Sequence, residues 1–406
     1  MKKKKAKKWI RFRHKVVTNL LKLFLIPYAK RKYNIKIEKF KEQNGRQFLV
    51  LANHQTAFDQ FFVAKAFKGS VYYVASEDIF SLGFVSKLIK YLVAPIPIRK
   101  QTTDVSAVLA CNRVAKEGGT IAIFPEGNRT YSGKTEYINP AIAGLARLLK
   151  LPIAIFRIEG GYGVHPRWSD VVRKGEMRAY VAKVIEPEEF MTKSNEEVLA
   201  MIEKELFVDE GCECGEFVHK QAAEYMERAF YVCPYCGLSE FESHGDIIEC
   251  KKCNRQIRYT PTKKFEGIGF EFPFQFTTEW YRYQTKFVAQ LDISPYALTP
   301  IYKNEGVKLS EVLLFNKKVL LCKSVNIAMF NDRVEILTEK DAPMVLPFDK
   351  TRAITVLGKN KLNIYYEKKV YQIKANERFN ALKYVNLFYH YKNIQEGKAD
   401  DEFLGL

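Results

Sequence analysis

The sequence lacks an apolar run long enough to cross a lipid bilayer. A membrane-spanning helix needs roughly 20 consecutive apolar residues, and the longest candidate, residues 16–29, is interrupted by Lys22. Hydrophobic residues make up 47% of the 406 residues and charged residues 27%, a balance typical of folded globular chains and not of disordered or collagen-like ones. We therefore exclude a polytopic membrane protein and expect roughly two to four domains.

Acidic residues are nearly absent from the N-terminus. Residues 1–40 contain 15 lysines and arginines but a single acid, Glu38, so this segment carries +14 of the net charge of +19. No Ala-x-Ala pattern follows its apolar stretch, and a secretory signal needs such a cleavage site. The basic character therefore belongs to one segment, and that segment is not expected to be a secretory signal.

This N-terminal segment has the pattern of an amphipathic helix. The polar face is formed by Arg11, Lys15, Thr18 and Lys22, and the apolar side by Ile10, Val17, Leu20, Leu21 and Phe24. A basic amphipathic helix can lie in the interface of an anionic membrane. Two alternatives remain, a helix whose apolar side packs on its own protein and a basic arm that binds nucleic acid. We favour a peripheral position on the cytoplasmic face of the membrane, with membrane phospholipids as partners.

From about residue 41, short apolar runs alternate with helical patterns. Strands are predicted at residues 47–51, 70–75, 120–124 and 152–158, and helices at residues 56–67, 105–116 and 141–150. This alternation predicts an α/β domain with a mainly parallel sheet flanked by helices. In such sheets ligands bind at the carboxyl ends of the strands, and three polar clusters occur there.

His54 and Asp59 form the first cluster, directly after the strand at residues 47–51. A turn that folds back brings the Asp59 carboxylate to one imidazole nitrogen of His54 and leaves the other nitrogen free to accept a proton. This is the base and the orienting group of a catalytic triad without its serine, so the nucleophile would be a hydroxyl group of the substrate. The alternative is an ordinary polar histidine in a turn.

The other two clusters supply arginines. Gly127 and Arg129 lie in the loop at residues 124–130, where glycine permits a close backbone approach and a guanidinium group offers a fork for phosphate oxygens. Arg99 follows the apolar run at residues 91–98 and is a second candidate phosphate ligand. Taken alone, each arginine could equally be a solvated charge at a strand end.

In their order these clusters resemble the motifs of the glycerolipid acyltransferase family, the group that contains bacterial lysophosphatidate acyltransferase. The motifs are Asn-His-x4-Asp at residues 53–59, Pro-Ile-Arg at 97–99, Phe-Pro-Glu-Gly-x-Arg at 124–129 and Leu-Pro-Ile at 151–153, and the resemblance covers about residues 15–205. It implies that His54 is the general base, oriented by Asp59, and that the phosphate and glycerol end of the acceptor is bound by Arg99, Glu126, Gly127 and Arg129. Asn128 and Thr130 stand where the family usually has threonine and serine, a departure that concerns acceptor recognition.

The resemblance implies an enzyme, a glycerolipid O-acyltransferase of phospholipid biosynthesis. It would move a fatty acyl group from a thioester, acyl-CoA or acyl-carrier protein, to the hydroxyl group of a lysophospholipid, with lysophosphatidate as the favoured acceptor. The competing hypothesis is a non-catalytic membrane lipid- or protein-binding adaptor on an acyltransferase-like fold. The presence of both His54 and Asp59 argues against the adaptor.

Four of the eight cysteines form two Cys-x2-Cys pairs, Cys233 with Cys236 and Cys250 with Cys253. This spacing is close to that of a zinc ribbon and predicts one structural zinc ion held by four thiolates. The rival is a redox-active dithiol, because Cys-Pro-Tyr-Cys also resembles the glutaredoxin motif. Free thiols together with zinc thiolates fit a reducing cytosol, and we interpret the remaining cysteines as ordinary thiols: Cys111, Cys212, Cys214 and Cys322.

A zinc ribbon in a basic chain also raises the possibility of nucleic-acid binding. Residues 233–258, however, mix both charge signs and have no basic stripe with interleaved aromatic residues, which a nucleic-acid surface would show. Nucleic acid is therefore not an expected partner, and we interpret the ribbon as a spacer or docking module.

The C-terminal part has the alternating pattern of β-strands. After an aromatic-rich stretch at residues 263–300, short strands are predicted at residues 311–315, 318–321, 326–330, 333–337, 353–357, 361–366 and 369–373, and a helix at 377–391. Seven strands and a closing helix resemble a PH-like or GRAM-like domain; the alternative is a β-barrel that supports the enzyme. The predicted parts are a basic membrane-surface segment (1–40), an acyltransferase domain (41–205), a linker with the zinc ribbon (206–262), and an aromatic linker with the PH-like domain (263–406).

Overall fold

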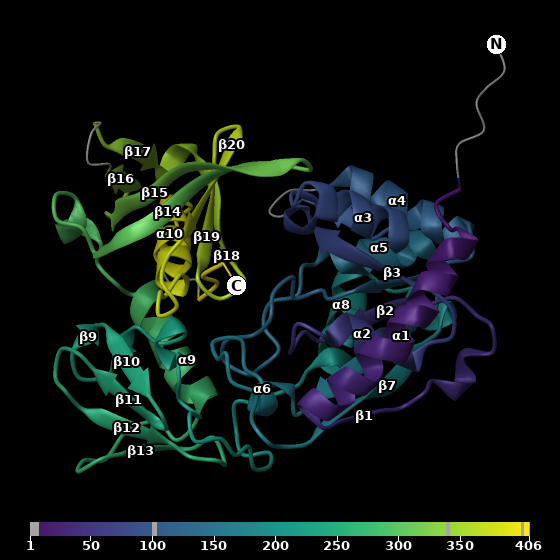
Figure 1. The fold of residues 1–406 in the computed structure, drawn as a ribbon, viewed down its shortest axis with the longest axis horizontal. Helices are drawn as coiled ribbons and strands as arrows, with labels where there is room; N and C mark the ends of the chain where they lie inside the picture. The colour runs from purple at the N-terminus through teal and green to yellow at the C-terminus, as the bar shows by residue number, and fades with distance from the viewer. Residues whose placement is uncertain (1–7, 100–103, 338–341, 399–401, 406) are drawn as a thin grey trace. The chain divides into compact units, whose positions relative to one another are not determined.

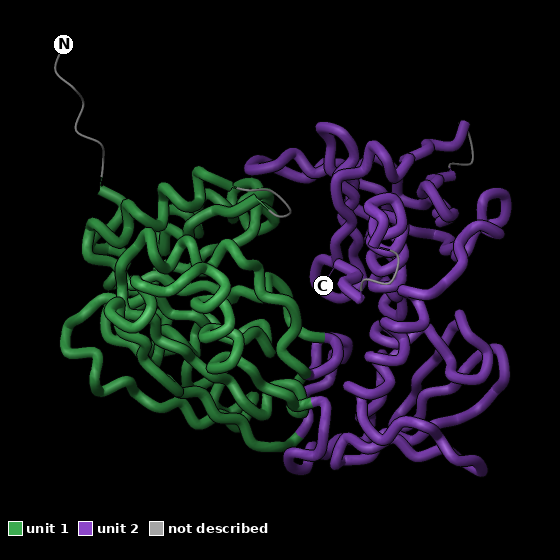
Figure 2. The backbone as a smooth tube through the Cα atoms, turned by 180° about the vertical axis from the view of Figure 1, so that it is seen from behind, with its two compact units in different colours: residues 1–130, 134–165, 174–210 green, residues 131–133, 166–173, 211–406 purple. Residues whose placement is uncertain are grey.

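The computed structural model describes residues 8–99, 104–337, 342–398 and 402–405. The lysines at residues 2–5 and 7, which belong to the predicted membrane-surface segment, lie outside the described residues. The chain divides into two compact units (Figure 2): unit 1 comprises residues 1–130, 134–165 and 174–210, and unit 2 comprises residues 131–133, 166–173 and 211–406.

Unit 1 contains the predicted parallel sheet. Its strands run in the order β1-β7-β6-β2-β5-β3-β4, and all neighbouring pairs are parallel except β6 with β7. A mainly parallel sheet flanked by helices is thereby confirmed (Figure 1). The strands are β1 (Ile35–Ile37), β2 (Leu49–Ala52), β3 (Val71–Ser76), β4 (Ile96–Ile98), β5 (Thr120–Ile123), β6 (Ile153–Glu159) and β7 (Met177–Ile185).

Helices cover both faces of this sheet. The helices are α1 (Phe12–Tyr33), α2 (Asp59–Ala66), α3 (Phe84–Leu92), α4 (Val105–Lys116), α5 (Ala141–Leu149), α6 (Gly161–Val164), α7 (Pro187–Phe190) and α8 (Asn195–Leu206). Leu49 and Leu51 of β2 join the core that α4, α5 and α8 form. Because side chains alternate along a strand, Val50 points to the opposite face, where α2 packs on β1, β3 and β7. Each fully buried aliphatic side chain in such a core contributes roughly 1.5–3 kcal/mol.

Helix α1 turns part of its predicted polar face toward the protein. Lys22 is half-buried, and its Nζ donates hydrogen bonds to the carbonyl oxygens of Phe67 (3.1 Å) and Gly69 (3.2 Å). These carbonyls follow the C-terminus of α2, where the helix dipole attracts a cation. Ile10 precedes the helix instead of belonging to it. Among the described residues, no helix combines the length and the apolar character that crossing a membrane requires.

Unit 2 begins with small antiparallel sheets around the four cysteines. Strand β8 (Val232–Cys233) pairs with β9 (Gly237–Leu238), and a second sheet has the order β10-β11-β12-β13. Its strands are β10 (Phe241–His244), β11 (Ile247–Cys250), β12 (Gln256–Tyr259) and β13 (Phe265–Gly267). The aromatic-rich stretch supplies α9 (Thr277–Ala289). The fully buried Trp280 of this helix stacks on Phe230 at a ring-centroid distance of 4.1 Å.

A seven-stranded antiparallel sheet follows in the order β17-β16-β15-β14-β20-β19-β18. The β-rich character of this part is confirmed, but a PH-like fold is not. The predicted strands at residues 318–321 and 326–330 are two halves of β15, and β17 was not predicted. The elements are β14 (Tyr302–Leu313), β15 (Lys317–Met329), β16 (Arg333–Leu337), β17 (Met344–Pro347), β18 (Thr351–Leu357), β19 (Lys361–Tyr366), β20 (Lys369–Lys374) and α10 (Leu382–Gln395).

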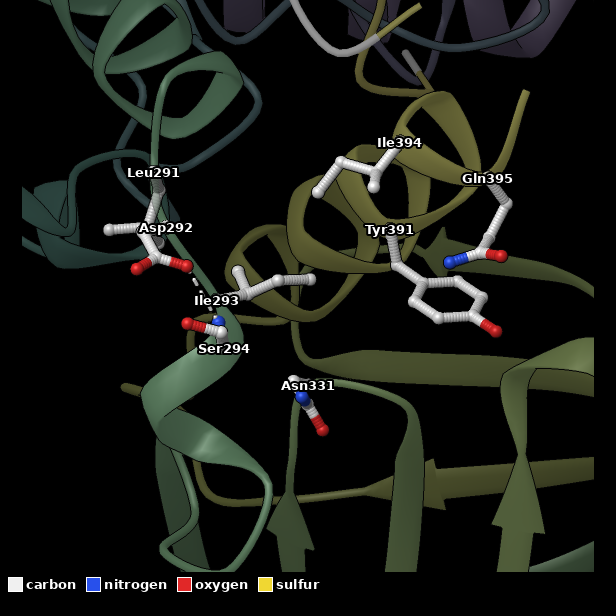
Figure 3. A pocket seen from close by; sticks show the side chains of 8 residues that line it. All are labelled: Leu291, Asp292, Ile293, Ser294, Asn331, Tyr391, Ile394 and Gln395. Carbon is white, nitrogen blue, oxygen red and sulfur yellow. Dashed lines mark hydrogen bonds between the residues drawn. The ribbon is translucent and has the colours of Figure 1, made fainter. Parts of the chain in front are cut away.

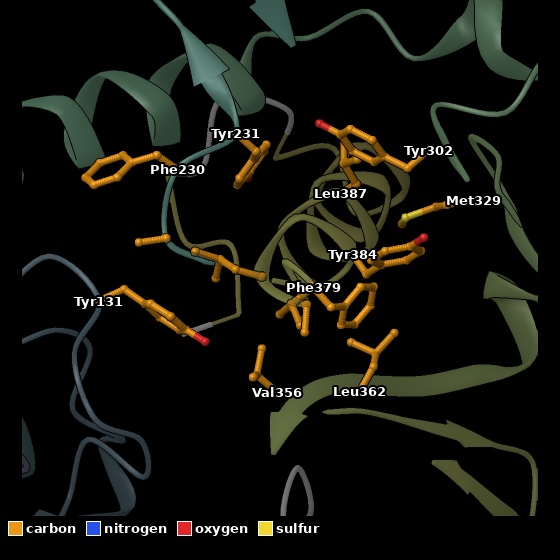
Figure 4. Packing of buried hydrophobic residues seen from close by; sticks show 14 of the residues in the cluster. Tyr131, Phe230, Tyr231, Tyr302, Met329, Val356, Leu362, Phe379, Tyr384 and Leu387 are labelled. Carbon is orange, nitrogen blue, oxygen red and sulfur yellow. The ribbon is translucent and has the colours of Figure 1, made fainter. Parts of the chain in front are cut away.

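One hydrophobic core extends through unit 2 (Figure 4). Tyr384 and Leu387 of α10 pack with Val356 of β18 and Leu362 of β19, and Phe230, which precedes β8, belongs to the same buried cluster. The region of the ribbon and the C-terminal sheet are therefore held in one compact unit by a shared core.

Candidate active site

The predicted base and its partner meet at the carboxyl end of β2. His54 follows β2, and Asp59 is the first residue of α2. The Nδ1 atom of His54 lies 2.8 Å from Oδ2 of Asp59. The side chain of His54 keeps 23% of its surface exposed, whereas that of Asp59 is fully buried. The turn between β2 and α2 thus hides the carboxylate and leaves part of the imidazole ring accessible.

Four donors hold the Asp59 carboxylate in place. Besides His54, the backbone N–H groups of Gln55 (2.6 Å) and Thr56 (2.9 Å) and the Oγ1 hydroxyl of Thr56 (2.6 Å) donate to it. All four groups point a donor at the carboxylate, whose oxygens accept these bonds. With the His54 proton on Nδ1, facing Asp59, the neutral imidazole presents the lone pair of Nε2, as a general base requires.

The loop after β5 encloses the other side of His54. Strand β5 is the direct neighbour of β2, and both are parallel, so their carboxyl ends lie at the same edge of the sheet. The ring of Phe124 stacks on the His54 ring with a centroid distance of 4.5 Å. This contact restricts the imidazole to one orientation, and the sequence pattern did not single out Phe124 as a site residue.

Glu126 has a contact that the sequence did not predict. Its Oε1 atom accepts a hydrogen bond from the backbone N–H of His54 (2.9 Å), and Oε2 accepts one from the backbone N–H of Glu136 (3.3 Å). Burial of the carboxyl group raises the pKa of Glu126 to about 8. The side chain of Glu126 thus ties the turn of His54 to the neighbouring loop; its role in acceptor binding stays a prediction.

Asn53 fastens the end of β2 to β6. Its Nδ2 donates to the carbonyl oxygen of Ile158 and its Oδ1 accepts from the N–H of Ile158, both at 2.8 Å. A fully buried asparagine must satisfy its polar atoms inside the protein, and this pair of bonds does so. The only signal in the sequence was a polar residue at the end of an apolar strand, next to His54.

The remaining predicted residues lie along the same edge of the sheet. Gly127 has φ +69°, and no atom lies within 4 Å of a Cβ built on it, so the left-handed backbone and not a close contact favours glycine there. Arg129 is half-buried in the same loop, and Arg99 is exposed directly after β4. Since β3 separates β4 from β5 and strands are about 4.8 Å apart, Arg99 lies roughly 10 Å from the loop after β5 along the edge of the sheet.

The C-terminus of α1 packs against the turn that holds His54 and Asp59. The buried Tyr33 ring packs against Phe58, the residue before Asp59, with a centroid distance of 5.5 Å. Burial, and next the negative charge of Asp59, raise the pKa of Tyr33 to about 12. The phenol group of Tyr33 is therefore uncharged at physiological pH. Its packing on Phe58 couples the position of α1 to that of α2.

The four predicted metal ligands gather in unit 2. The Sγ atoms of Cys233, Cys236, Cys250 and Cys253 all lie within 4.8 Å of one another, and those of Cys233 and Cys253 are 3.9 Å apart. Sulfur ligands of a tetrahedral zinc ion, with Zn–S distances near 2.3 Å, are about 3.8 Å apart. The residue after each Cys-x2-Cys pair, Gly237 or Asn254, has a positive φ. The donor set and its geometry therefore fit one zinc ion.

Comparisons with known proteins find similarity in the part of the chain that contains His54 and Asp59. Residues 33–158 match the family model described as Acyltransferase. No curated protein sequence matches the chain significantly. Among solved structures, the 1-acyl-sn-glycerophosphate (LPA) acyltransferase PlsC from Thermotoga maritima is similar over 48% of this chain and 79% of its own, with 21% identity and a TM-score of 0.39. Residues 33–158, which contain the paired His54 and Asp59, therefore belong to the acyltransferase family.

Proposed function

We propose that this protein transfers a fatty acyl group from an acyl thioester to the hydroxyl group of a lysophospholipid, with lysophosphatidate as the favoured acceptor. The observation that carries the proposal is the hydrogen bond between His54 and Asp59, which leaves Nε2 available as a base at a partly exposed position. The arginines at the same sheet edge, Arg99 and Arg129, support an acceptor that bears a phosphate group.

In the proposed reaction, Nε2 of His54 takes the proton of the acceptor hydroxyl as its oxygen attacks the thioester carbonyl. The C–O bond forms, the tetrahedral intermediate collapses with cleavage of the C–S bond, and the imidazolium returns the proton to the departing thiolate. Asp59 stabilises the imidazolium and keeps the ring oriented. A base positioned in this way contributes about 10²–10⁴-fold to the rate.

The direct test is an assay of the purified chain with labelled acyl-CoA or acyl-carrier protein against a panel of lysolipids. We expect transfer to lysophosphatidate to exceed transfer to a neutral monoacylglycerol. The variant Arg129→Ala should raise KM for the phosphate-bearing acceptor by about tenfold or more, because a charge-assisted hydrogen bond is worth about 1.5–3 kcal/mol, and should leave the neutral acceptor nearly unaffected. Arg147→Ala, on α5, is the control. Equal loss with both acceptors would contradict phosphate recognition by Arg129.

We further propose that unit 1 docks on an anionic membrane, at the cytoplasmic face. Support comes from large apolar side chains that α1 and α3 expose, which we call the apolar face; Phe24 is 69% exposed and Phe84 77%. Exposed patches of this kind in a monomer mark interaction sites. Lys87 and Lys90 on α3 are exposed beside it. The apolar face comprises Phe12, Val16, Leu20, Leu23, Phe24 and Tyr28 of α1 and Phe84, Val85, Leu88 and Tyr91 of α3.

Changing Leu20 and Phe24 together to aspartate should weaken binding to phosphatidylglycerol-containing vesicles by at least about tenfold. The loss should occur at every salt concentration, because each inserted apolar side chain contributes roughly 1.5–3 kcal/mol when fully buried. Activity should fall more on vesicle-borne acceptor than on a short-chain soluble one. Leu148→Asp with Phe207→Asp, two residues with similar exposure elsewhere in unit 1, is the matched control. Unchanged sedimentation with vesicles would argue against the apolar face as the docking surface.

A further inference from the structure

A hollow of about 460 Å³ lies between α1 and α2, beside the apolar face. Its polar lining consists of Lys22, Lys30, Lys65 and Asn19, and its apolar lining includes Leu23 and Ile26. None of the described residues that line it is acidic. We call this hollow the lysine pocket.

The charges in the lysine pocket are incompletely compensated. Burial, together with the positive charge of Lys65, lowers the pKa of Lys22 to about 8. The carbonyl oxygens of Phe67 and Gly69 accept two of the three ammonium hydrogens of Lys22. An anion in the pocket would offset the repulsion between the two ammonium groups, since like charges held near each other raise the free energy of both charged forms.

A second hollow, in unit 2, differs from the lysine pocket in the charge of its lining residues (Figure 3). It measures about 260 Å³, and among its lining residues the only charged side chain is Asp292, whose carboxylate accepts a hydrogen bond from the N–H of Ser294 at 2.9 Å. Such a lining offers no cation to an anionic ligand. Of the two hollows, only the lysine pocket is lined by positively charged side chains that attract an anionic ligand.

The lysine pocket adjoins the C-terminal end of α2, the end away from Asp59. Asp59 begins α2, whereas Lys65 lies in its last turn, so the two are about 9 Å apart along the helix axis at 1.5 Å per residue. Lys65 therefore lies at the end of α2 away from Asp59, whereas Arg99 follows β4 and Arg129 lies in the loop after β5. They lie next to Leu23, which belongs to the apolar face.

We infer that the lysine pocket binds the anionic phosphate headgroup of a membrane phospholipid while the apolar face inserts beside it; this inference rests on the proposed membrane docking. Three ammonium groups complement a phosphate. The apolar wall of Leu23 and Ile26 fits the glycerol and first methylene groups of a lipid better than a free hydrated ion. A headgroup held there would fix the rotation of α1 on the membrane, and with it Tyr33 behind the catalytic turn.

The test compares two pairs of substitutions with the same charge change. Lys30→Gln with Lys65→Gln alters the pocket, and Lys87→Gln with Lys90→Gln removes two exposed cations of α3. Cosedimentation is measured on phosphatidylcholine vesicles with and without phosphatidylglycerol. Both pairs lose the general attraction of about 1 kcal/mol per cation to an anionic surface. We expect the pocket pair to lose about tenfold more binding to anionic vesicles than the α3 pair. This difference should persist at raised salt, because charges in close contact are screened less.

Equal losses in the two pairs would overturn the lysine pocket as a headgroup site. Lys65→Arg, which keeps the charge, should retain binding and shows that a loss does not come from misfolding. Inorganic phosphate is added at constant ionic strength as a second arm. Displacement of the wild type but not of the pocket pair would mean that phosphate and the headgroup compete for the pocket. Binding of phosphate by the wild type and not by the pocket pair, with cosedimentation unchanged, would assign the pocket to free phosphate and overturn the assignment to a lipid.

Acyl transfer to a short-chain soluble acceptor is measured on the same proteins. Normal transfer by the pocket pair, with reduced vesicle binding, is the expected result. If the wild type transfers no acyl group, the proposed enzymatic function fails, and the vesicle comparison still decides whether the lysine pocket binds lipid.

Discussion

Replacing His54 with alanine is expected to lower kcat by at least about 10²-fold, because the variant loses the general base that takes the acceptor's proton. The substitution removes the hydrogen bond to Asp59 and the stacking on Phe124, but the donors from Gln55 and Thr56 still hold the carboxylate. The fold should therefore survive. Transfer from a labelled thioester to lysophosphatidate under saturating acceptor is the measurement.

His244→Ala provides the control for this variant, since His244 is exposed in unit 2 with 65% of its side chain accessible. It should leave kcat unchanged. Binding of the acceptor by His54→Ala should also be close to normal, because the phosphate contacts proposed for Arg99 and Arg129 do not involve the imidazole. Full activity in the His54→Ala variant would falsify the proposed mechanism and favour the non-catalytic adaptor.

Replacing Cys236 with serine is expected to release one zinc ion per chain and to unfold the cysteine module of unit 2. Structural zinc carries folding free energy on the order of 10 kcal/mol, and the small sheets around the site, β8 to β13, share their buried core with α9 and the C-terminal sheet. Elemental analysis of protein purified without chelator measures the metal, and hydrogen exchange across residues 232–259 measures the unfolding.

Cys322→Ser serves as the reference for the zinc experiment. Its Sγ donates to the carbonyl oxygen of Ser324 on β15 and does not belong to the four-cysteine cluster, so zinc content should stay at one per chain. The rival hypothesis makes the opposite prediction for the wild type. Protein without zinc, in which Cys233 and Cys236 form a disulfide, would identify the pair as a redox dithiol.

Local patterns were sufficient to locate many elements of unit 1. The helix predicted at residues 105–116 is α4 with the same bounds, and the strand predicted at residues 120–124 is β5. Both are bounded by strong signals: Asp104 caps α4 through the N–H groups of Ser106 and Ala107, and glycines separate α4 from β5. The spacing of the cysteine pairs likewise placed four thiols around one point before any fold was known.

In the C-terminal sheet, local patterns were less reliable. The predicted break between residues 321 and 326 is absent, because β15 continues through it with irregular pairing: Val307 and Ser310 of β14 pair with Val325 and Leu320, so the extra residues lie on β15. Bulges absorb an irregular alternation of polar and apolar residues without ending the strand. A strand can thus continue where its own pattern fails, because a bulge in that strand takes up the extra residue.

Contacts between distant segments decided the remaining features of the site. Glu126 holds the N–H of His54 from 72 residues away, and no short-range pattern indicates that a carboxyl group will be enclosed by two neighbouring loops.

The orientation of helix α1 could not be predicted from local pattern either. Its apolar residues spread around much of the helix, so periodicity alone does not select the face that packs inward. The tertiary partners select it: Ile26, Ala29 and Tyr33 are buried against the protein and Lys22 donates to the carbonyl oxygens that follow α2, while Leu20 and Phe24 remain exposed. Hydrophobic patterns are set by neighbours along the chain, whereas the orientation of a helix depends on the partners that the whole fold brings to it.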